Sequence, residues 1–102
     1  MILMVTVWYP SHKALEVANK FNKLAAKGVP PVIKKWEVYG TIDGLNGLKG
    51  YHLIKTDREK TEDALMEINK LFAPMFTIDG FSTRVEILSG MKASAEILKY
   101  VK

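Results

Sequence analysis

The stretch GLNGLKG at residues 44–50 carries three glycines at a spacing of three, with Lys49 among them and His52 just beyond. Glycines and a lysine can form a loop whose backbone amides hold phosphate, and an imidazole behind it could act as a base. A phosphate loop, however, has the pattern GxxxxGK followed by Ser or Thr, and it opens directly into a helix. Here the glycines lead into YHLIK, which has the composition of a strand. We therefore interpret GLNGLKG as a turn between two strands.

The geometry of that turn decides where His52 lies. Asn46 and Gly47 are the preferred pair for a two-residue type I′ turn, because both central positions need positive φ. Such a turn places Ile42 opposite Tyr51, and Thr41 opposite His52. Paired residues share one face of a sheet, so the sequence predicts that His52 lies beside Thr41 on the less apolar face.

Alternation along the neighbouring strands adds further polar and aromatic side chains to this face. The candidate pocket or dimer-face residues are Thr6, Trp8, Tyr39, Thr41, His52, Arg84 and Glu86. His52 can be either a general base or a hydrogen-bonded structural histidine. Arg84 and Glu86 can form the polar handle of a pocket, or pair with each other or across a dimer. The sequence assigns no catalytic residue and leaves open whether the protein is an enzyme.

Metal and cofactor chemistry finds little support in the chain. There is no cysteine, and the two histidines lie in different predicted elements, with no partner at HxxxH or HxxE spacing from either. We expect no metal site and no cofactor. His12 falls in the first turn of a helix, where an exposed, inactive imidazole is the simplest interpretation. The alternative is a general base at the mouth of a pocket beside Trp8 and Tyr9.

Length and charge narrow the class of protein further. At 102 residues the chain forms a single domain, residues 1–102. Its net charge is only +4, and just two of its fifteen basic residues are arginines, Arg58 and Arg84. Because the lysines are spread along the chain, this composition does not favour nucleic-acid binding. Its richness in lysine and glutamate points mildly to a thermophile. The apolar start MILMVTVWYP is too short to span a bilayer, so we expect a cytoplasmic protein without membrane contact.

Hydrophobic periodicity predicts the order strand, helix, strand, strand, helix, strand, followed by a closing helix. The expected strands are 2–9, 32–43, 51–55 and 81–88. The first helix is expected from a Ser11 cap to Gly28, the second from a capping box of Thr56 and Glu59 to Pro74, and the last over 91–101. This order is typical of an α+β, ferredoxin-like sandwich, with helices on one face of a four-stranded antiparallel sheet.

The second face of such a sheet would have no helix over it. It would nevertheless carry large apolar side chains, namely Ile2, Met4, Trp8, Tyr39, Ile54 and Leu88. A face so rich in apolar groups is rarely left in water, and a second copy of the chain is the simplest cover for it. The sequence therefore predicts a homodimer that packs sheet against sheet.

Three segments then carry a resemblance that covers nearly the whole chain: MILMVTVWYP, VIKKWEVYGTIDGLNGLKGYHLIKTD and FSTRVEILS. Their pattern is similar to that of the dimeric α/β-barrel superfamily, and in particular to its small stand-alone families of unknown function. The resemblance implies two ferredoxin-like subunits, with ligand pockets between sheet and helices or within the barrel. Haem-degrading members bind iron through a helix histidine, and beyond His12 in the first turn of the first helix neither main helix expected here contains a histidine.

Two functions follow as hypotheses. The first is a homodimeric binding or assembly module without chemistry of its own, with room for a small hydrophobic ligand. The alternative is a cofactor-independent enzyme of the monooxygenase or isomerase type. It would act on a small hydrophobic or aromatic substrate above Trp8, Tyr39 and His52, using a single base.

Overall fold

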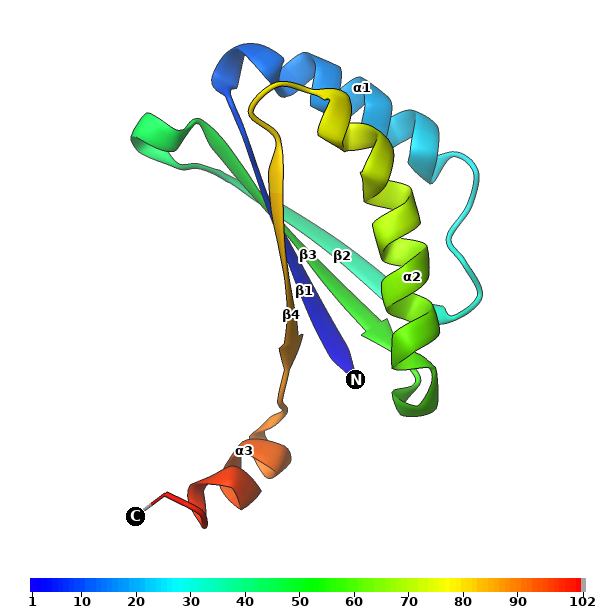
Figure 1. Ribbon diagram of the computed structural model, residues 1–102, viewed down its shortest axis with the longest axis vertical. Coiled ribbons are helices and arrows are strands. Elements are labelled where there is room, and N and C mark those ends of the chain that lie inside the picture. Colours follow the sequence, from blue (N-terminus) through cyan, green and yellow to red (C-terminus); the bar gives the residue numbers. More distant parts are fainter. Residues whose placement is uncertain (102) are drawn as a thin grey trace.

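The computed structural model describes residues 1–101, apart from the side chain of Asn46. Its strands and helices follow the predicted order, with a four-stranded sheet, two helices packed over it and a third beyond its end (Figure 1). The elements are β1 (Ile2–Tyr9), α1 (Ala14–Ala25), β2 (Ile33–Ile42), β3 (Leu48–Thr56), α2 (Thr61–Phe72), β4 (Ser82–Leu88) and α3 (Met91–Leu98).

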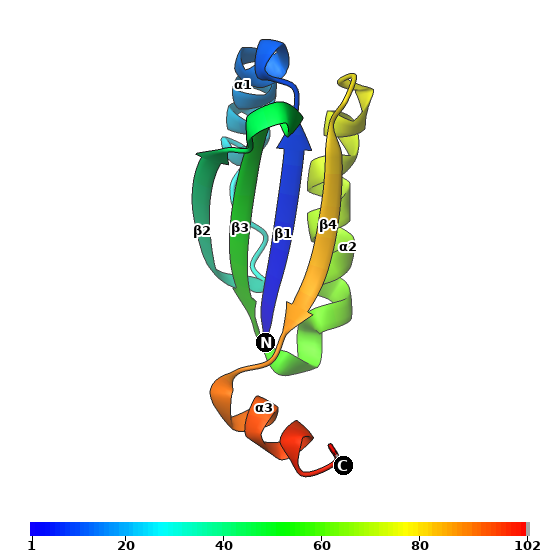
Figure 2. The same cartoon turned by 90° about the vertical axis from the view of Figure 1, so that its left-hand side faces the viewer.

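The sheet has the order β2-β3-β1-β4, and every neighbouring pair is antiparallel. Both α1 and α2 lie on the same side of it, and the other side carries no helix (Figure 2). This arrangement confirms the expected α+β class and is consistent with a ferredoxin-like sandwich.

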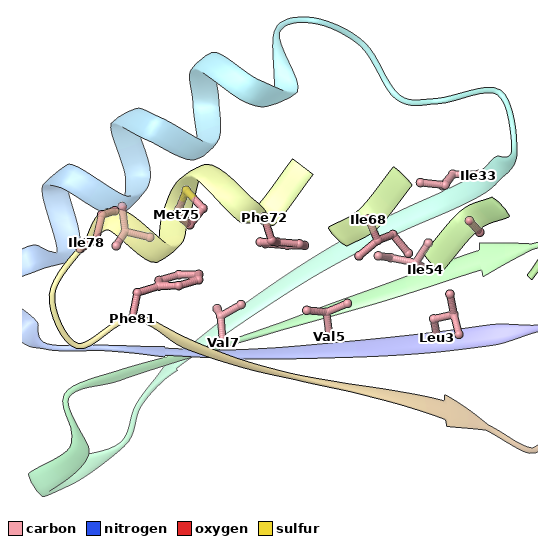
Figure 3. Packing of buried hydrophobic residues seen from close by; sticks show 12 residues of the cluster. Leu3, Val5, Val7, Ile33, Ile54, Ile68, Phe72, Met75, Ile78 and Phe81 are labelled. Carbon is pink, nitrogen blue, oxygen red and sulfur yellow. The ribbon is translucent and has the colours of Figure 1, made fainter. Parts of the chain in front are cut away.

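The core lies between the sheet and the helices (Figure 3). Leu3, Val5 and Val7 project from β1 at every second position, as a strand with one buried face requires, and all three are buried. Ile68 and Phe72 lie four residues apart on α2 and meet them from above. The core therefore combines the apolar alternation of a strand with the apolar spacing of a helix, as the sequence predicted.

Both main helices begin later than predicted. Ser11 makes no cap hydrogen bond and starts a short 3-10 turn, Ser11–Lys13, before α1. The capping box of Thr56 and Glu59 is likewise absent, because Thr56 is the last residue of β3 and a 3-10 turn, Arg58–Lys60, precedes α2. At its other end α2 stops at Phe72, and Pro74 lies in the 3-10 turn Ala73–Thr77.

The β2–β3 hairpin forms, but its turn differs from the prediction. The strands close at the pair Ile42 and Leu48, so five residues, 43–47, form the turn. Residues Gly44–Asn46 make a 3-10 turn, the Asp43 amide donates to the Gly47 carbonyl at 2.7 Å, and Gly47 has φ of 87°. The two-residue type I′ turn is therefore wrong. Each β3 residue pairs three positions earlier on β2 than that turn predicts, and an odd shift reverses the faces.

The register defines two faces of the sheet. The covered face includes Leu3, Val5 and Val7 of β1 and the residues paired with them, among which are Ile54, His52 and Gly50. The open face comprises residues 2, 4, 6 and 8 of β1, residues 35, 37, 39 and 41 of β2, residues 49, 51, 53 and 55 of β3, and residues 82, 84, 86 and 88 of β4. Val85 and Ile87 of β4 lie on the covered side, yet Ile87 is 56 % exposed.

The closing helix α3 projects beyond the end of the sheet (Figures 1 and 2). Its apolar side chains, including Met91, Ile97 and Leu98, are exposed to solvent. Within residues 1–101, no helix combines the length and the apolar character needed to cross a bilayer.

The turn can be tested with two glycine variants. Both Gly44 and Gly47 have positive φ, but only at Gly47 would a Cβ atom collide with the Tyr9 carbonyl oxygen. We expect Gly47→Ala to lower the free energy of unfolding in urea by at least about 2 kcal/mol, and the matched control Gly44→Ala to lower it by about 1 kcal/mol. Equal losses would show that Gly47 does not approach the end of β1.

Candidate functional site

The structure divides the seven predicted site residues between the two faces. Six of them, Thr6, Trp8, Tyr39, Thr41, Arg84 and Glu86, share the open face. His52 does not join them, because it pairs with Val5 on one side and Val38 on the other, on the covered face. The predicted position of His52 was therefore wrong, and no pocket can include Trp8, Tyr39 and the His52 imidazole together on one face.

His52 lies in a cluster of aromatic rings and is only 5 % exposed. Its ring centroid is 5.2 Å from that of Phe21, 5.1 Å from that of Phe72 and 5.8 Å from that of Trp36. The Trp36 indole Nε1–H donates a hydrogen bond to His52 Nδ1 at 2.9 Å. Because Nδ1 accepts this hydrogen bond, the neutral imidazole carries its own proton on Nε2.

Burial among these rings lowers the pKa of His52 to about 4, because an apolar environment disfavours the charged form. At neutral pH the side chain is therefore neutral. Among the described residues no hydrogen bond satisfies Nε2, and no fully enclosed polar side-chain atom lacks a partner. Nε2 thus retains contact with open space and offers one donor there.

The His52 side chain lines a cavity of about 150 Å³ between the sheet, α1 and the 3-10 turn after α2. Its walls are mostly apolar and include Val17 and Phe21 of α1, Phe72 of α2 and Met75. Figure 3 shows Phe72, Met75, Phe81 and Val7 projecting into the region between sheet and helices. His52 is the one imidazole among its lining residues.

The cavity exists because two glycines face each other across its floor. Gly40 on β2 pairs with Gly50 on β3, and both line the cavity. With no side chain at either position, the sheet leaves a gap beneath α1 next to Val7. Gly50 belongs to the stretch GLNGLKG, so this part of the motif provides space for a ligand-sized group instead of a phosphate contact.

A second hollow of about 200 Å³ adjoins the cavity at the β2 edge. It is lined by Trp36, Leu71 and the C-terminal part of α1, and it shares Phe21 and Val38 with the first cavity. Val38 is 53 % exposed, although it lies on the covered face. The β2 edge is therefore the side from which a small molecule can reach His52.

On the open face, cations lie over the aromatic rings. Lys49 Nζ is 5.3 Å from the Trp8 ring centroid and 5.2 Å from that of Tyr51, and Arg84 Cζ is 6.0 Å from that of Trp8. The Tyr39 hydroxyl donates to Glu37 at 2.7 Å, and this hydrogen bond lowers the pKa of the Glu37 carboxyl. These contacts are favourable and surface-exposed, and they place no base beside a nucleophile.

Residues 1–101 contain no group of three His, Asp or Glu side chains arranged to hold a metal ion. His12 lies in the exposed 3-10 turn that precedes α1, and it is not among the residues that line the cavity at His52. Comparison with protein-family models gave no match, and comparison with curated proteins gave none either. The geometry of the chain is therefore the basis for any functional proposal.

Trp36, Phe21 and Gly40 belong to the site but were not among the predicted residues. A signal for the correct face was present in β3, where Lys49, Tyr51, Leu53 and Lys55 alternate with Gly50, His52 and Ile54. Two lysines on one side indicate that this side faces water or a polar interface, which places His52 inside. The preference of Asn-Gly for two-residue turns outweighed that signal.

The position of His52 predicts how stability depends on pH. A histidine in the unfolded chain has a pKa of about 6.5, whereas burial lowers the pKa of His52 in the folded protein to about 4. Between these two pH values the unfolded chain binds a proton at this residue and the folded protein does not. The contribution of His52 to the free energy of unfolding is therefore fully present above pH 6.5 and falls as the pH falls towards 4. Between pH 7.5 and pH 5 we expect His52 to lower the free energy of unfolding by about 2 kcal/mol.

Urea unfolding of the parent and of His52→Gln across this range measures the effect. The matched control is His12→Gln, at the exposed histidine, which should keep the slope of the parent. Parallel pH profiles for the parent and His52→Gln would contradict the buried position of His52.

Proposed function

We propose that the protein is a homodimeric binding and assembly module of the dimeric α/β-barrel type, in which a second copy covers the open face. The observation that supports this most directly is the centre of that face. Six large apolar side chains gather there and are each half-buried in the single chain: Ile2, Met4, Trp8, Tyr51, Leu53 and Leu88. A contiguous apolar surface with a polar rim is typical of a protein interface.

The charges at the β4 edge favour a second copy as the occupant. Arg84 and Glu86 are two residues apart on the open face, level with Thr6 and Met4 respectively. Consider a two-fold axis in the interface, at right angles to the strands and midway between these levels. It places Arg84 of each copy opposite Glu86 of the other, so one surface is complementary to itself.

The same axis brings apolar groups together in the middle of the face. Leu53 and Tyr51 occupy the same two levels on β3, so each lies opposite the other residue of the partner. Lys49 comes opposite Lys55 of the other copy, and these two positive charges repel each other. The rings of Trp8 and Tyr51 beneath Lys49 offset part of that repulsion. The exposed apolar side of α3 supplies further surface for a second copy to cover.

Nucleic acid fits the open face less well. Bases stack on free aromatic faces with arginines around them, whereas Lys49 and Arg84 already lie over the rings here. The carboxylates of Glu37 and Glu86 on the same face would repel phosphate. These contacts support protein association over binding of a polyanion.

The geometry around His52 supports binding over catalysis. A general base needs a free acceptor nitrogen, but Nδ1 is hydrogen-bonded to Trp36 and Nε2 carries the proton. The cavity of about 150 Å³ is also half of the ~300 Å³ at which ligand pockets for drug-sized molecules begin. A monooxygenase- or isomerase-type reaction would therefore need a base from elsewhere in the chain.

Charge-reversal variants test the dimer and its axis together. We expect the parent to sediment as a dimer at micromolar concentration. Arg84→Glu alone, or Glu86→Arg alone, places like charges opposite each other and should weaken the dimer at least about tenfold. The double variant R84E/E86R restores the complementary pairs and should recover the parent's dissociation constant.

A parent that sediments as a monomer would contradict the proposed homodimer. A dimer that is unaffected by the single reversals would contradict the axis. Retardation of single-stranded RNA by the parent, with loss of that retardation in Arg84→Glu, would assign the open face to nucleic acid instead.

A further inference from the structure

The cavity beneath α1 supports an inference that does not depend on the dimer, because all the residues that line this partly open cavity belong to a single chain. Its volume of about 150 Å³ matches the size at which apolar protein cavities take up benzene. Its lining rings, Phe21, Phe72 and Phe81, offer edges and faces to a planar guest. Size and lining therefore both suit a single aromatic ring.

The polar part of the cavity narrows the ligand class further. Apart from His52, Tyr9 and Tyr39, the residues that line the cavity are apolar, and none of them is charged, so a charged ligand would lose its hydration without gaining a counter-charge. The imidazole is neutral and its Nδ1 is engaged by Trp36, which leaves Nε2–H as a donor in a fixed orientation. A fixed donor in apolar surroundings discriminates strongly for a ligand that accepts its hydrogen bond.

We propose that this cavity binds a small, neutral aromatic molecule with one acceptor oxygen, which accepts a hydrogen bond from His52 Nε2–H while the ring packs against Phe21 and Phe72. Trp36 is a positioning residue in this site, since its indole holds the imidazole in the tautomer that donates into the cavity. The ligand enters at the β2 edge, past exposed Val38.

Two ligands of nearly equal shape separate the roles of size and hydrogen bond. Acetophenone has an aromatic ring and a carbonyl acceptor, and ethylbenzene has the same outline without the acceptor. Binding is followed by NMR through the two indole N–H resonances. Trp36 contacts His52, whereas Trp8 lies on the open face, so the Trp36 resonance should shift on titration and the Trp8 resonance should not.

We expect the parent to bind acetophenone about tenfold more tightly than ethylbenzene, as one net hydrogen bond allows. Benzoate, which is charged, should produce no shift of the Trp36 resonance. His52→Phe removes the donor and should bind both neutral ligands with equal affinity.

A second variant keeps the test informative if His52→Phe does not fold. Gly40 lies on the cavity floor without positive φ, and a Cβ there meets only the Lys49 carbonyl oxygen at 3.9 Å. Gly40→Val therefore fits the strand, fills the floor and should weaken binding of both ligands more than tenfold. Three results would each overturn the proposal: no shift of the Trp36 resonance with either ligand, equal affinities in the parent, or unchanged binding in Gly40→Val.

Discussion

The hydrogen bond from Trp36 Nε1–H to His52 Nδ1 is the interaction on which the site depends. It joins β2 to β3 across the covered face, and it can form only in the register that pairs Val38 with His52. A shift of the hairpin by one residue would send the imidazole to the open face and leave the indole donor without its partner. The bond also sets the tautomer of His52, and hence the chemistry that the cavity offers.

The two faces of one sheet have different physical characters. On the covered face, paired glycines and aromatic rings create an apolar cavity with one oriented donor. On the open face, half-buried apolar side chains are flanked by charges of both signs, an arrangement suited to association. Because strand residues alternate between faces, neighbouring residues such as Tyr51 and His52 contribute to different functions. A substitution at either position should therefore affect one function while leaving the other in place.

The sequence predicted the element order, the antiparallel sheet and the face without helices, because long periodic segments determine these features. It did not predict the hairpin register. The Asn46–Gly47 pair favours a two-residue turn locally, but Gly44 and Gly47 both take positive φ and allow a longer, five-residue turn that contains the 3-10 segment Gly44–Asn46. The local preference of Asn-Gly favours one register of the hairpin, and the packing of His52 beneath Phe21 and Phe72 favours another. The structure has the register that allows this packing.

For the candidate site, too, the features set by strand periodicity were predicted, and the feature set by the hairpin register was not. Six of the seven predicted residues share the open face because alternation along β1, β2 and β4 places them on one side of the sheet. His52 alone depended on the predicted register, and its face was wrong for that reason. Trp36 could be identified as an inward-facing residue from the sequence. Its role as donor to His52 required the three-dimensional pairing.

Long-range ¹H–¹⁵N NMR of the imidazoles near neutral pH tests the central claim most directly, because it reports which ring nitrogen carries the proton. The structure predicts a single His52 tautomer with the proton on Nε2 and an unprotonated Nδ1 that accepts from the Trp36 indole. A His52 imidazole that exchanges between tautomers, or that is protonated on both nitrogens at that pH, would contradict the buried, Trp36-bound position from which the cavity and its ligand class were derived.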